Sequence, residues 1–388
     1  MSSNVSLEQL LASKEIVVTC GSGGVGKTTT AATLATMAAI HLGGKVLVLT
    51  VDPARRLANA MGLESFGNVA TRVSSQALVS AGIEPRGELW AAMLDTKQSW
   101  DDLIVRHAPD VKTRDAILAN PMYQNVTGRF VQSHDYIAME RLYELHSSGE
   151  YDLIVVDTPP TRNALDFLEA PARMADFFSS RLLRWLLAPY RSRIISVASK
   201  PFYQIADRIL GSAFLEDIAE FFMLFQSMHD GFVERAQAVE RVLSDRRTTF
   251  LVVSTLEPSP LREAEFFIKA LNDKGLHLGG VILNKVLPSY LLDVEVSDAA
   301  EKLISEPKYV LSAIDKERLA SLGDEQSIAR VLNEVGMSFR NFQLIGKREA
   351  EQRAELSTAP EVMVSVPYFD DDIYDVAGLA RMGEQIWR

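Results

Sequence analysis

A glycine-rich segment near the start of the chain has the residue types and spacing of a phosphate-binding loop. It reads GSGGVGKT from Gly21 to Thr28, after an apolar segment and before a segment rich in Ala and Thr. Glycines let the backbone bend until several N–H groups point at phosphate oxygens, and the positive end of a following helix adds to the attraction. Lys27 is then placed to reach the β and γ phosphates of a nucleoside triphosphate, and the Thr28 hydroxyl is placed to bind Mg²⁺. A glycine-rich turn without a ligand is the alternative.

Two aspartates follow apolar segments that have the pattern of strands. Asp52 comes directly after VLVLTV, and Asp157 ends the segment LIVVD. Ligands of parallel sheets bind beyond the carboxyl ends of the strands, so we expect both carboxylates near the triphosphate. Asp157 suits a role in holding the metal, and Asp52 suits the orientation or deprotonation of the attacking water. Each of them could instead cap a helix.

These residues require strands that end at one edge of a sheet and helices that begin there. Short apolar segments alternate with helical patterns, which is typical of a parallel sheet covered by helices. Continuous apolar runs such as LIVVD and FLVVST indicate strands that are buried on both faces. The predicted strands are Glu15–Cys20, Lys45–Val51, Glu88–Leu94, Asp152–Asp157, Thr249–Thr255, Leu278–Asn284 and Glu361–Val366. The expected fold class is α/β: a doubly wound, mostly parallel sheet of the P-loop NTPase type with an inserted helical subdomain.

Two long stretches break the alternation of strands and helices. Residues 96–149 and 161–246 have helical patterns one after another and are predicted to form the helical subdomain. The remaining residues, 1–95, 150–160 and 247–388, are predicted to form the nucleotide-binding core. Within the core, the segment from about 295 to 355 also has a helical pattern.

Aromatic residues are concentrated in the second helical stretch. Residues 177–232 hold 11 of the 31 aromatic residues, and several follow helical spacing, among them Phe221, Phe225 and Phe232. They are interpreted either as the core of the subdomain or as a groove for an apolar partner helix. Residues 173–208 add seven basic residues, which could form a solvated helix face or contact an anionic membrane surface: Arg173, Arg181, Arg184, Arg191, Arg193, Lys200 and Arg208.

Composition limits the partners of the chain. It has 388 residues and a formal net charge of −11, which argues against broad binding to nucleic-acid phosphates. Cys20 is the one cysteine, so no intrachain disulfide or multi-cysteine metal site can form. No signal peptide and no apolar stretch of about 18 residues is visible. We therefore expect a cytoplasmic protein, with peripheral contact to a membrane as an alternative.

Three motifs together resemble those of the ArsA-like ATPases. They are GSGGVGKTT, VDPARRL and VDTPPTRNALDFL, and the likeness extends to the LNK that ends at Lys285 and to VPYFDDDI near the C-terminus. This family includes the arsenite-pump ATPase and the ATPase that targets tail-anchored membrane proteins, and it belongs to the deviant Walker A class. The likeness is greatest to the Get-like actinobacterial members.

The resemblance implies a nucleotide-driven dimer that hydrolyses ATP with Mg²⁺, and whose opening and closing are coupled to a hydrophobic client. It implies that Lys27 and Asp52 are catalytic and that Thr28 and Asp157 support the metal. It also implies that the nucleotide is held by Gly23, Gly24, Val25, Gly26, Lys27, Thr28, Thr29, Asn284 and Pro367, with Asn284 recognising adenine and the backbone near Pro367 flanking the base. Asn284 could instead be a turn residue at a strand end.

The chain departs from the family pattern at three places. Ser22 stands where the deviant motif has a lysine that reaches the nucleotide of the other subunit. The cysteines that bind zinc or arsenite in relatives are absent, so neither ligand is expected. Arg162 and Asn163 replace the Gly-His of the second switch in the targeting ATPase. These departures leave open whether the partner is a second copy of the chain or a related ATPase that keeps the lysine.

Two other functions remain as alternatives. One is a nucleotide-binding switch or scaffold that hydrolyses ATP weakly, because serine cannot supply a charge to the transition state in trans. The other is a positioning ATPase similar to ParA or MinD, although the long helical stretches argue against it.

Overall fold

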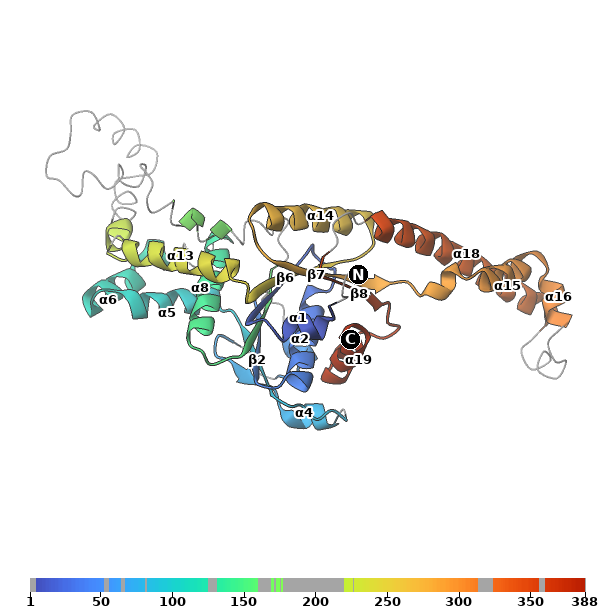
Figure 1. Cartoon of the computed structure of the whole chain (residues 1–388), viewed down its shortest axis with the longest axis horizontal. Coiled ribbons are helices and arrows are strands. Elements are labelled where there is room, and N and C mark those ends of the chain that lie inside the picture. Colours follow the sequence, from blue (N-terminus) through green and yellow to red (C-terminus); the bar gives the residue numbers. More distant parts are fainter. Residues whose placement is uncertain are drawn as a thin grey trace, which may run out of the picture.

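The computed structural model describes residues 5–51, 56–63, 67–80, 82–124, 131–159, 169–170, 172–174, 176, 220–225, 227–312, 324–355 and 360–387. Their centre is one eight-stranded sheet with the strand order β3-β4-β2-β5-β1-β6-β7-β8 (Figure 1). The strands are β1 (Ile16–Cys20), β2 (Lys45–Thr50), β3 (Thr71–Arg72), β4 (Glu88–Met93), β5 (Leu153–Asp157), β6 (Thr248–Ser254), β7 (Leu278–Val286) and β8 (Val362–Pro367). Neighbouring strands are parallel except β3, which is antiparallel to β4.

The α/β fold class expected from the sequence is confirmed. Each of the seven predicted strands is present, with bounds that differ by no more than two residues. The sequence did not predict β3, because a strand of two residues carries no periodicity. The central strands β1, β5 and β6 are buried along their whole length, as their continuous apolar sequences require.

Helices cover both faces of this sheet, and some extend away from it. They are α1 (Leu7–Leu11), α2 (Lys27–His41), α3 (Arg56–Ala60), α4 (Ser75–Ser80), α5 (Thr96–His107), α6 (Val111–Ala119), α8 (Val131–Ser147), α13 (His229–Ser244), α14 (Pro258–Asp273), α15 (Val294–Ser305), α16 (Pro307–Ser312), α18 (Glu325–Glu355) and α19 (Val376–Ile386), with a 3-10 helix η1 at Ser289–Leu292. Of these, α15, α16, α18 and η1 extend away from the sheet. Within the described residues no helix combines the length and the apolar character needed to cross a bilayer.

Side chains of each strand alternate between two apolar cores. On β1, Ile16 and Val18 pack into the core that α5, α8, α13 and α14 cover, whereas Val17 packs against α1, α2 and α19. Helix α2 is buried on nearly all sides, and its alanines let it lie close to both the sheet and α19. The phosphate-loop segment therefore leads into a helix that is held between two layers.

The helical layer has an aromatic core. The ring centroid of Trp100 lies 5.7 Å from that of Tyr136 and 6.3 Å from that of Phe232. Phe221, Phe225 and Phe232 are no more than 5% exposed. The interpretation of these three phenylalanines as core is confirmed, and a groove lined by them is not. The aromatic residues between Phe177 and Phe214, and the basic residues from Arg181 to Arg208, lie outside the described residues.

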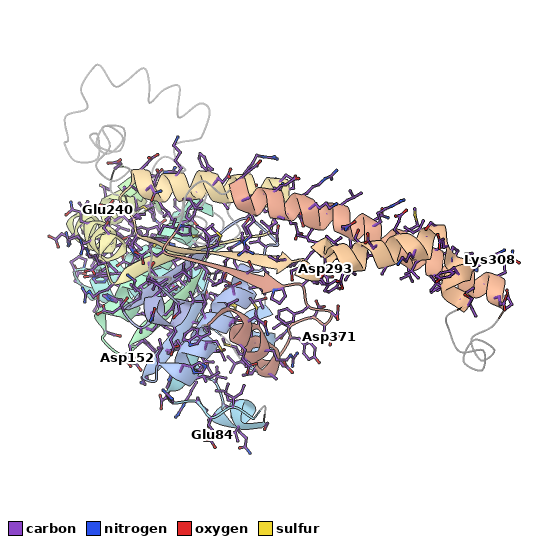
Figure 2. All side chains as sticks on the ribbon, turned by 45° about the vertical axis from the view of Figure 1, so that its right-hand side comes forward. Glu84, Asp152, Glu240, Asp293, Lys308 and Asp371 are labelled. Atoms are coloured by element: carbon purple, nitrogen blue, oxygen red, sulfur yellow. The ribbon has the colours of Figure 1, made fainter. Side chains whose placement is uncertain are left out.

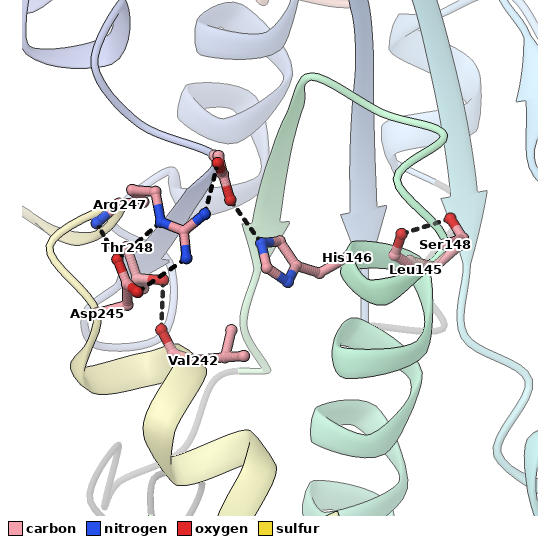
Figure 3. A network of polar contacts seen from close by, with 8 residues as sticks. Leu145, His146, Ser148, Val242, Asp245, Arg247 and Thr248 are labelled. Atoms are coloured by element: carbon pink, nitrogen blue, oxygen red, sulfur yellow. Dashed lines mark hydrogen bonds and ion pairs between the residues drawn. The ribbon is translucent and has the colours of Figure 1, made fainter.

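A polar network joins the helical layer to the sheet at the edge opposite the phosphate loop. Glu15, just before β1, accepts from His146 of α8 at 2.7 Å and from Arg247 at 2.9 Å. Arg247 also donates to both carboxylate oxygens of Asp245 in the turn before β6 (Figure 3). These bonds hold the pKa of Glu15 below its usual range and lower the pKa of Asp245 to about 2. The network fixes the end of α8 and the start of β6 relative to β1.

A helical hairpin extends away from the sheet between β7 and β8. Helix α18 runs beside α15, and the labelled Asp293 and Lys308 mark the near and far ends of this arm in Figure 2. The two helices touch closely at Gly336, where a Cβ atom would lie 2.7 Å from Ile304 Cγ1 and 2.8 Å from the Ala300 carbonyl oxygen. The helical pattern expected between about 295 and 355 is thus confirmed, whereas its projection from the core had no sign in the sequence.

Candidate nucleotide-binding site

The segment from Gly21 to Gly26 forms the turn between β1 and α2. Gly26 has a φ of 95°, which an L side chain adopts only with strain, and a Cβ atom there would collide with the Asn284 amide nitrogen. Gly21 passes so close to the Val253 carbonyl oxygen of β6 that it too has no room for a side chain. Glycine is therefore required at these two places by the close approach of β6 and β7.

Lys27 is the first residue of α2 and is 6% exposed. Its ammonium group donates a hydrogen bond of 2.9 Å to the Ser22 carbonyl oxygen, so the side chain folds back over the loop. A lysine held in this way lies over the concave side of the loop, where phosphate oxygens would bind the backbone N–H groups. The structure therefore places the Lys27 ammonium group at the loop, and its role toward phosphate stays a prediction.

Asp157 ends β5 and lies directly beside the phosphate loop. It pairs with Thr19 of β1 on one side and with Thr50 of β2 on the other, and its side chain is fully buried. The Thr50 hydroxyl donates to the Asp157 carboxylate at 2.9 Å. The Thr158 hydroxyl donates to the Thr19 carbonyl oxygen at 2.8 Å and holds the chain after β5 against β1.

Asp52 lies outside the described residues. The residue before it, Val51, donates its backbone N–H to the Asp157 carbonyl oxygen at 3.1 Å, so β2 ends level with β5. Arg162 and Asn163 of the second switch also lie outside the described residues. The roles of Asp52 and of this switch stay predictions.

An open pocket of about 810 Å³ begins at the phosphate loop and continues along α2 to the loop between β8 and α19. Of the residues expected to bind nucleotide, it is lined by Gly23, Gly24, Gly26, Lys27, Thr28, Thr29, Asn284 and Pro367. The structure thus brings the two ends of the expected site into one cavity, although Asn284 and Pro367 are far from the loop in sequence.

Asn284 and Val25 are joined inside this site. The Asn284 side-chain amide donates to the Val25 carbonyl oxygen at 2.8 Å, and its side-chain oxygen accepts from the Lys285 backbone N–H at 2.9 Å. The Val25 side chain is 1% exposed and packs into the core below the loop. Val25 is not among the residues that line the pocket, and Asn284 ties the end of β7 to the phosphate loop through the Val25 carbonyl oxygen.

Several residues that line the pocket carried no signal of their own in the sequence. They are Leu57, Asn59 and Ala60 of α3, Thr158, Lys285, Met382 and the loop residues Tyr368, Phe369, Asp371, Asp372, Ile373 and Tyr374. The loop belongs to the VPYFDDDI segment, whose likeness to the family was visible, but no spacing rule could place its side chains in a cavity with residues 23–29.

Ser22 and Cys20 flank the start of the loop and do not line the pocket. Ser22 is 9% exposed, and no hydrogen-bond partner of its hydroxyl is found in the part of the chain that the structure describes. Burial raises the pKa of the Cys20 thiol well above its usual value, so this group stays protonated at neutral pH. Neither side chain supplies charge to the site.

Comparisons with known proteins agree with this geometry. The chain is 27% identical over 267 residues to the ATPase GET3 of Malassezia globosa. This aligned region covers 69% of the chain and 71% of the relative. It is 25% identical over 349 residues to the ATPase get3 of Aspergillus niger, with 88% and 89% covered, and 25% identical over 292 residues to an ATPase ASNA1 homolog of Entamoeba dispar, with 73% and 80% covered. The model of the anion-transporting ATPase (ArsA) family matches residues 14–316. The chain therefore belongs to the ArsA family and is an ATP-binding ATPase.

Proposed function

We propose that the chain binds ATP with Mg²⁺ in the pocket between the phosphate loop and the β8–α19 loop, and hydrolyses it to ADP and phosphate. One observation carries this proposal: a single cavity of about 810 Å³ joins the phosphate-binding residues to Asn284 and Pro367. A site for phosphate alone would need only the loop, whereas this cavity continues far enough to take a nucleoside.

The residues present fit Mg–ATP. The loop presents Gly23, Gly24 and Gly26 to the cavity, and Lys27 is held above them by the Ser22 carbonyl oxygen. Thr28 lines the same cavity, whereas the Asp157 carboxylate is fully buried at the end of the adjacent strand and is not part of the cavity lining. Hydroxyl and carboxylate oxygens are the ligands that Mg²⁺ prefers, so Thr28 and Asp157 would hold it. A bound Mg²⁺ supplies positive charge to the phosphate oxygens.

Lys27, Asp52 and Thr50 each have a separate part in the proposed reaction. Lys27 leaves the Ser22 carbonyl for the β and γ phosphates and stabilises the negative charge that develops there. Asp52 orients the attacking water and takes its proton. Thr50 fixes the Asp157 carboxylate through its 2.9 Å hydrogen bond, so the metal-side carboxylate need not reorient during turnover.

We infer that turnover opens and closes a dimer of two copies of this chain and that this change is coupled to a hydrophobic client. The inference depends on the motif resemblance and on the family, and neither favours a heterodimer over two copies. Closure of two facing sites would bring the negative charges of two triphosphates together, and Ser22 has no charge to compensate them. A closed dimer must therefore obtain this charge from another residue, for which Arg55 and Arg56 of the VDPARRL motif and Arg162 of the second switch are the candidates. We place the protein in the cytoplasm.

Steady-state ATP hydrolysis by the purified chain tests the enzymatic part. Lys27→Ala should abolish turnover, because the positive charge at the β and γ phosphates is lost, while Lys308→Ala at the far end of the arm should not change it. If the wild-type chain bound ATP with no turnover above that of Lys27→Ala, the weakly hydrolysing switch would be the better description.

The dimer and client are tested separately. Size-exclusion chromatography with light scattering, with and without ATP, should show two copies of the chain in the ATP-bound state. Purification of the native complex should recover an apolar helical partner whose retention depends on nucleotide. ATP-dependent binding to DNA or to a lipid surface without such a partner would favour the ParA- or MinD-like alternative.

A further inference from the structure

Strand β7 has a bulge where it reaches the nucleotide pocket. Leu283 pairs with Ser365 of β8, and the next pairing is Val286 with Pro367. Asn284 and Lys285 of β7 therefore lie opposite the single residue Val366 of β8. A bulge of this kind bends the strand and changes the direction in which its side chains point.

Lys285 has an unusual backbone conformation at this bulge. Its φ is 59°, and among the described residues it is the only non-glycine residue with a positive φ. Lysine adopts this left-handed conformation at a cost in free energy, which glycine or asparagine would largely avoid. The conformation is held from both sides, because Lys285 donates its N–H to the Asn284 side-chain oxygen and Val286 accepts from the Tyr368 N–H at 2.9 Å. Strained residues of this kind concentrate at functional sites.

The strained residue presents its side chain to the pocket. Lys285 is exposed and lines the cavity together with Asn284, Pro367 and Tyr368. Within the part of the chain that the structure describes, no ion pair or side-chain hydrogen bond of its ammonium group is found. The side chain is therefore available to a ligand, and it lies beyond Asn284 from the end of the phosphate loop.

We propose that Lys285 positions the nucleoside part of ATP. Its methylene stem runs alongside the base, and its ammonium group lies over the face of the ring, where a cation is attracted by the π-system. The proposal rests on the proposed placement of ATP in this pocket. It explains why a strained lysine stands where asparagine or glycine would fold at lower cost: the bulge gives up local stability to direct a cationic side chain at the ligand.

Two substitutions separate binding from backbone strain. Lys285→Ala removes the side chain and keeps a residue with a Cβ atom in the left-handed conformation. Lys285→Gly removes the side chain and also relieves the strain. Lys308→Ala, at the far end of the arm, is the control for the loss of one positive charge. Affinities are measured by calorimetry with Mg²⁺ and a non-hydrolysable ATP analogue, and in parallel with Mg²⁺ and inorganic tripolyphosphate, which has no nucleoside.

Both Lys285 variants should bind the ATP analogue about 3–10-fold more weakly, as expected for the loss of one stacking or cation–π contact. Both should bind tripolyphosphate as the wild type does. The melting temperature of the ligand-free protein should rise by roughly 1–2 °C in Lys285→Gly and should not rise in Lys285→Ala. A more stable variant with weaker binding is the combined result that a purely structural lysine would not produce.

Unchanged affinity for the ATP analogue in both variants would overturn the proposal, and so would an equal loss for the analogue and for tripolyphosphate. A failure of the proposed function gives a different pattern. In that case the wild type itself would not bind the analogue, or Lys27→Ala would bind it as tightly as the wild type.

Discussion

Replacing Gly26 by alanine should damage the protein through Asn284, a residue that is distant in sequence. Gly26 has a φ of 95°, and a Cβ atom at this position would collide with the Asn284 amide nitrogen. The left-handed conformation alone costs an alanine about 1–2 kcal/mol. Displacing the Asn284 amide also breaks its 2.8 Å hydrogen bond and leaves the buried Val25 carbonyl oxygen unsatisfied, which costs about 1–3 kcal/mol. The sum is about 2–5 kcal/mol of the free energy of unfolding.

Gly24 offers a matched control within the same loop. Its φ is 82°, so an alanine there has a similar backbone strain, but no atom lies within 4 Å of the position that its Cβ would take. Gly24→Ala should therefore lower the free energy of unfolding by only about 1–2 kcal/mol. Urea denaturation of the ligand-free proteins, read from tryptophan fluorescence and circular dichroism, measures both changes.

A double-mutant cycle then isolates the contact with Asn284. In the Asn284→Ala background the collision is gone and the hydrogen bond is already lost, so Gly26→Ala should cost about 1–3 kcal/mol less than in the wild type. Affinity for ATP should fall in Gly26→Ala as the end of β7 is pushed away from the loop. Equal costs for Gly24→Ala and Gly26→Ala, together with additive costs in the cycle, would refute the coupling between the loop and β7.

Three further predictions concern other parts of the chain. Ser22→Ala should leave ATP turnover and stability unchanged or slightly improved. The Ser22 hydroxyl has no hydrogen-bond partner among the described residues, and Lys27 is held by the backbone of Ser22 rather than by its side chain. A large loss of turnover in a steady-state assay would show that the hydroxyl acts in catalysis. Because the pKa of Asp245 is lowered, the stabilising contribution of this carboxylate is present above the unfolded-state pKa of about 3.8 and is lost as the pH falls toward about 2. The stabilities of the wild type and of Asp245→Asn should therefore converge over this pH interval in acid unfolding curves. Curves that run parallel down to about pH 2 would contradict this prediction. Gly336→Val should separate α15 from α18 and reduce the helical circular dichroism signal, because its Cβ would lie 2.8 Å from the Ala300 carbonyl oxygen. ATP turnover should not change, since Gly336 does not line the pocket; loss of turnover with intact helices would show that the arm acts on the site.

The sequence by itself determined the parts of this protein that depend on neighbouring residues. The phosphate loop is one of them, since the glycines, Lys27 and Thr28 are contiguous and the strand before them and the helix after them have clear patterns. The strands are another, because a run such as LIVVD is short, apolar and β-branched, which indicates a strand buried on both faces. Asp157 could be placed near the loop on the same grounds, since carboxyl ends of parallel strands meet at one edge.

Only the tertiary structure decided what distant segments do together. The Asn284–Val25 hydrogen bond joins residues 259 positions apart, and it exists because the sheet places β7 within reach of the loop through β6 and β1. The bulge at Lys285 depends on pairing with β8, and the burial of Phe225 and Phe232 depends on α5 and α8, which come more than seventy residues earlier. An apolar helical pattern indicates that one face of the helix is covered, but it does not identify the element that covers it. The sequence alone therefore could not decide whether the aromatic segment forms a core or a groove. It also contained no sign that α15 and α18 pack against each other away from the sheet.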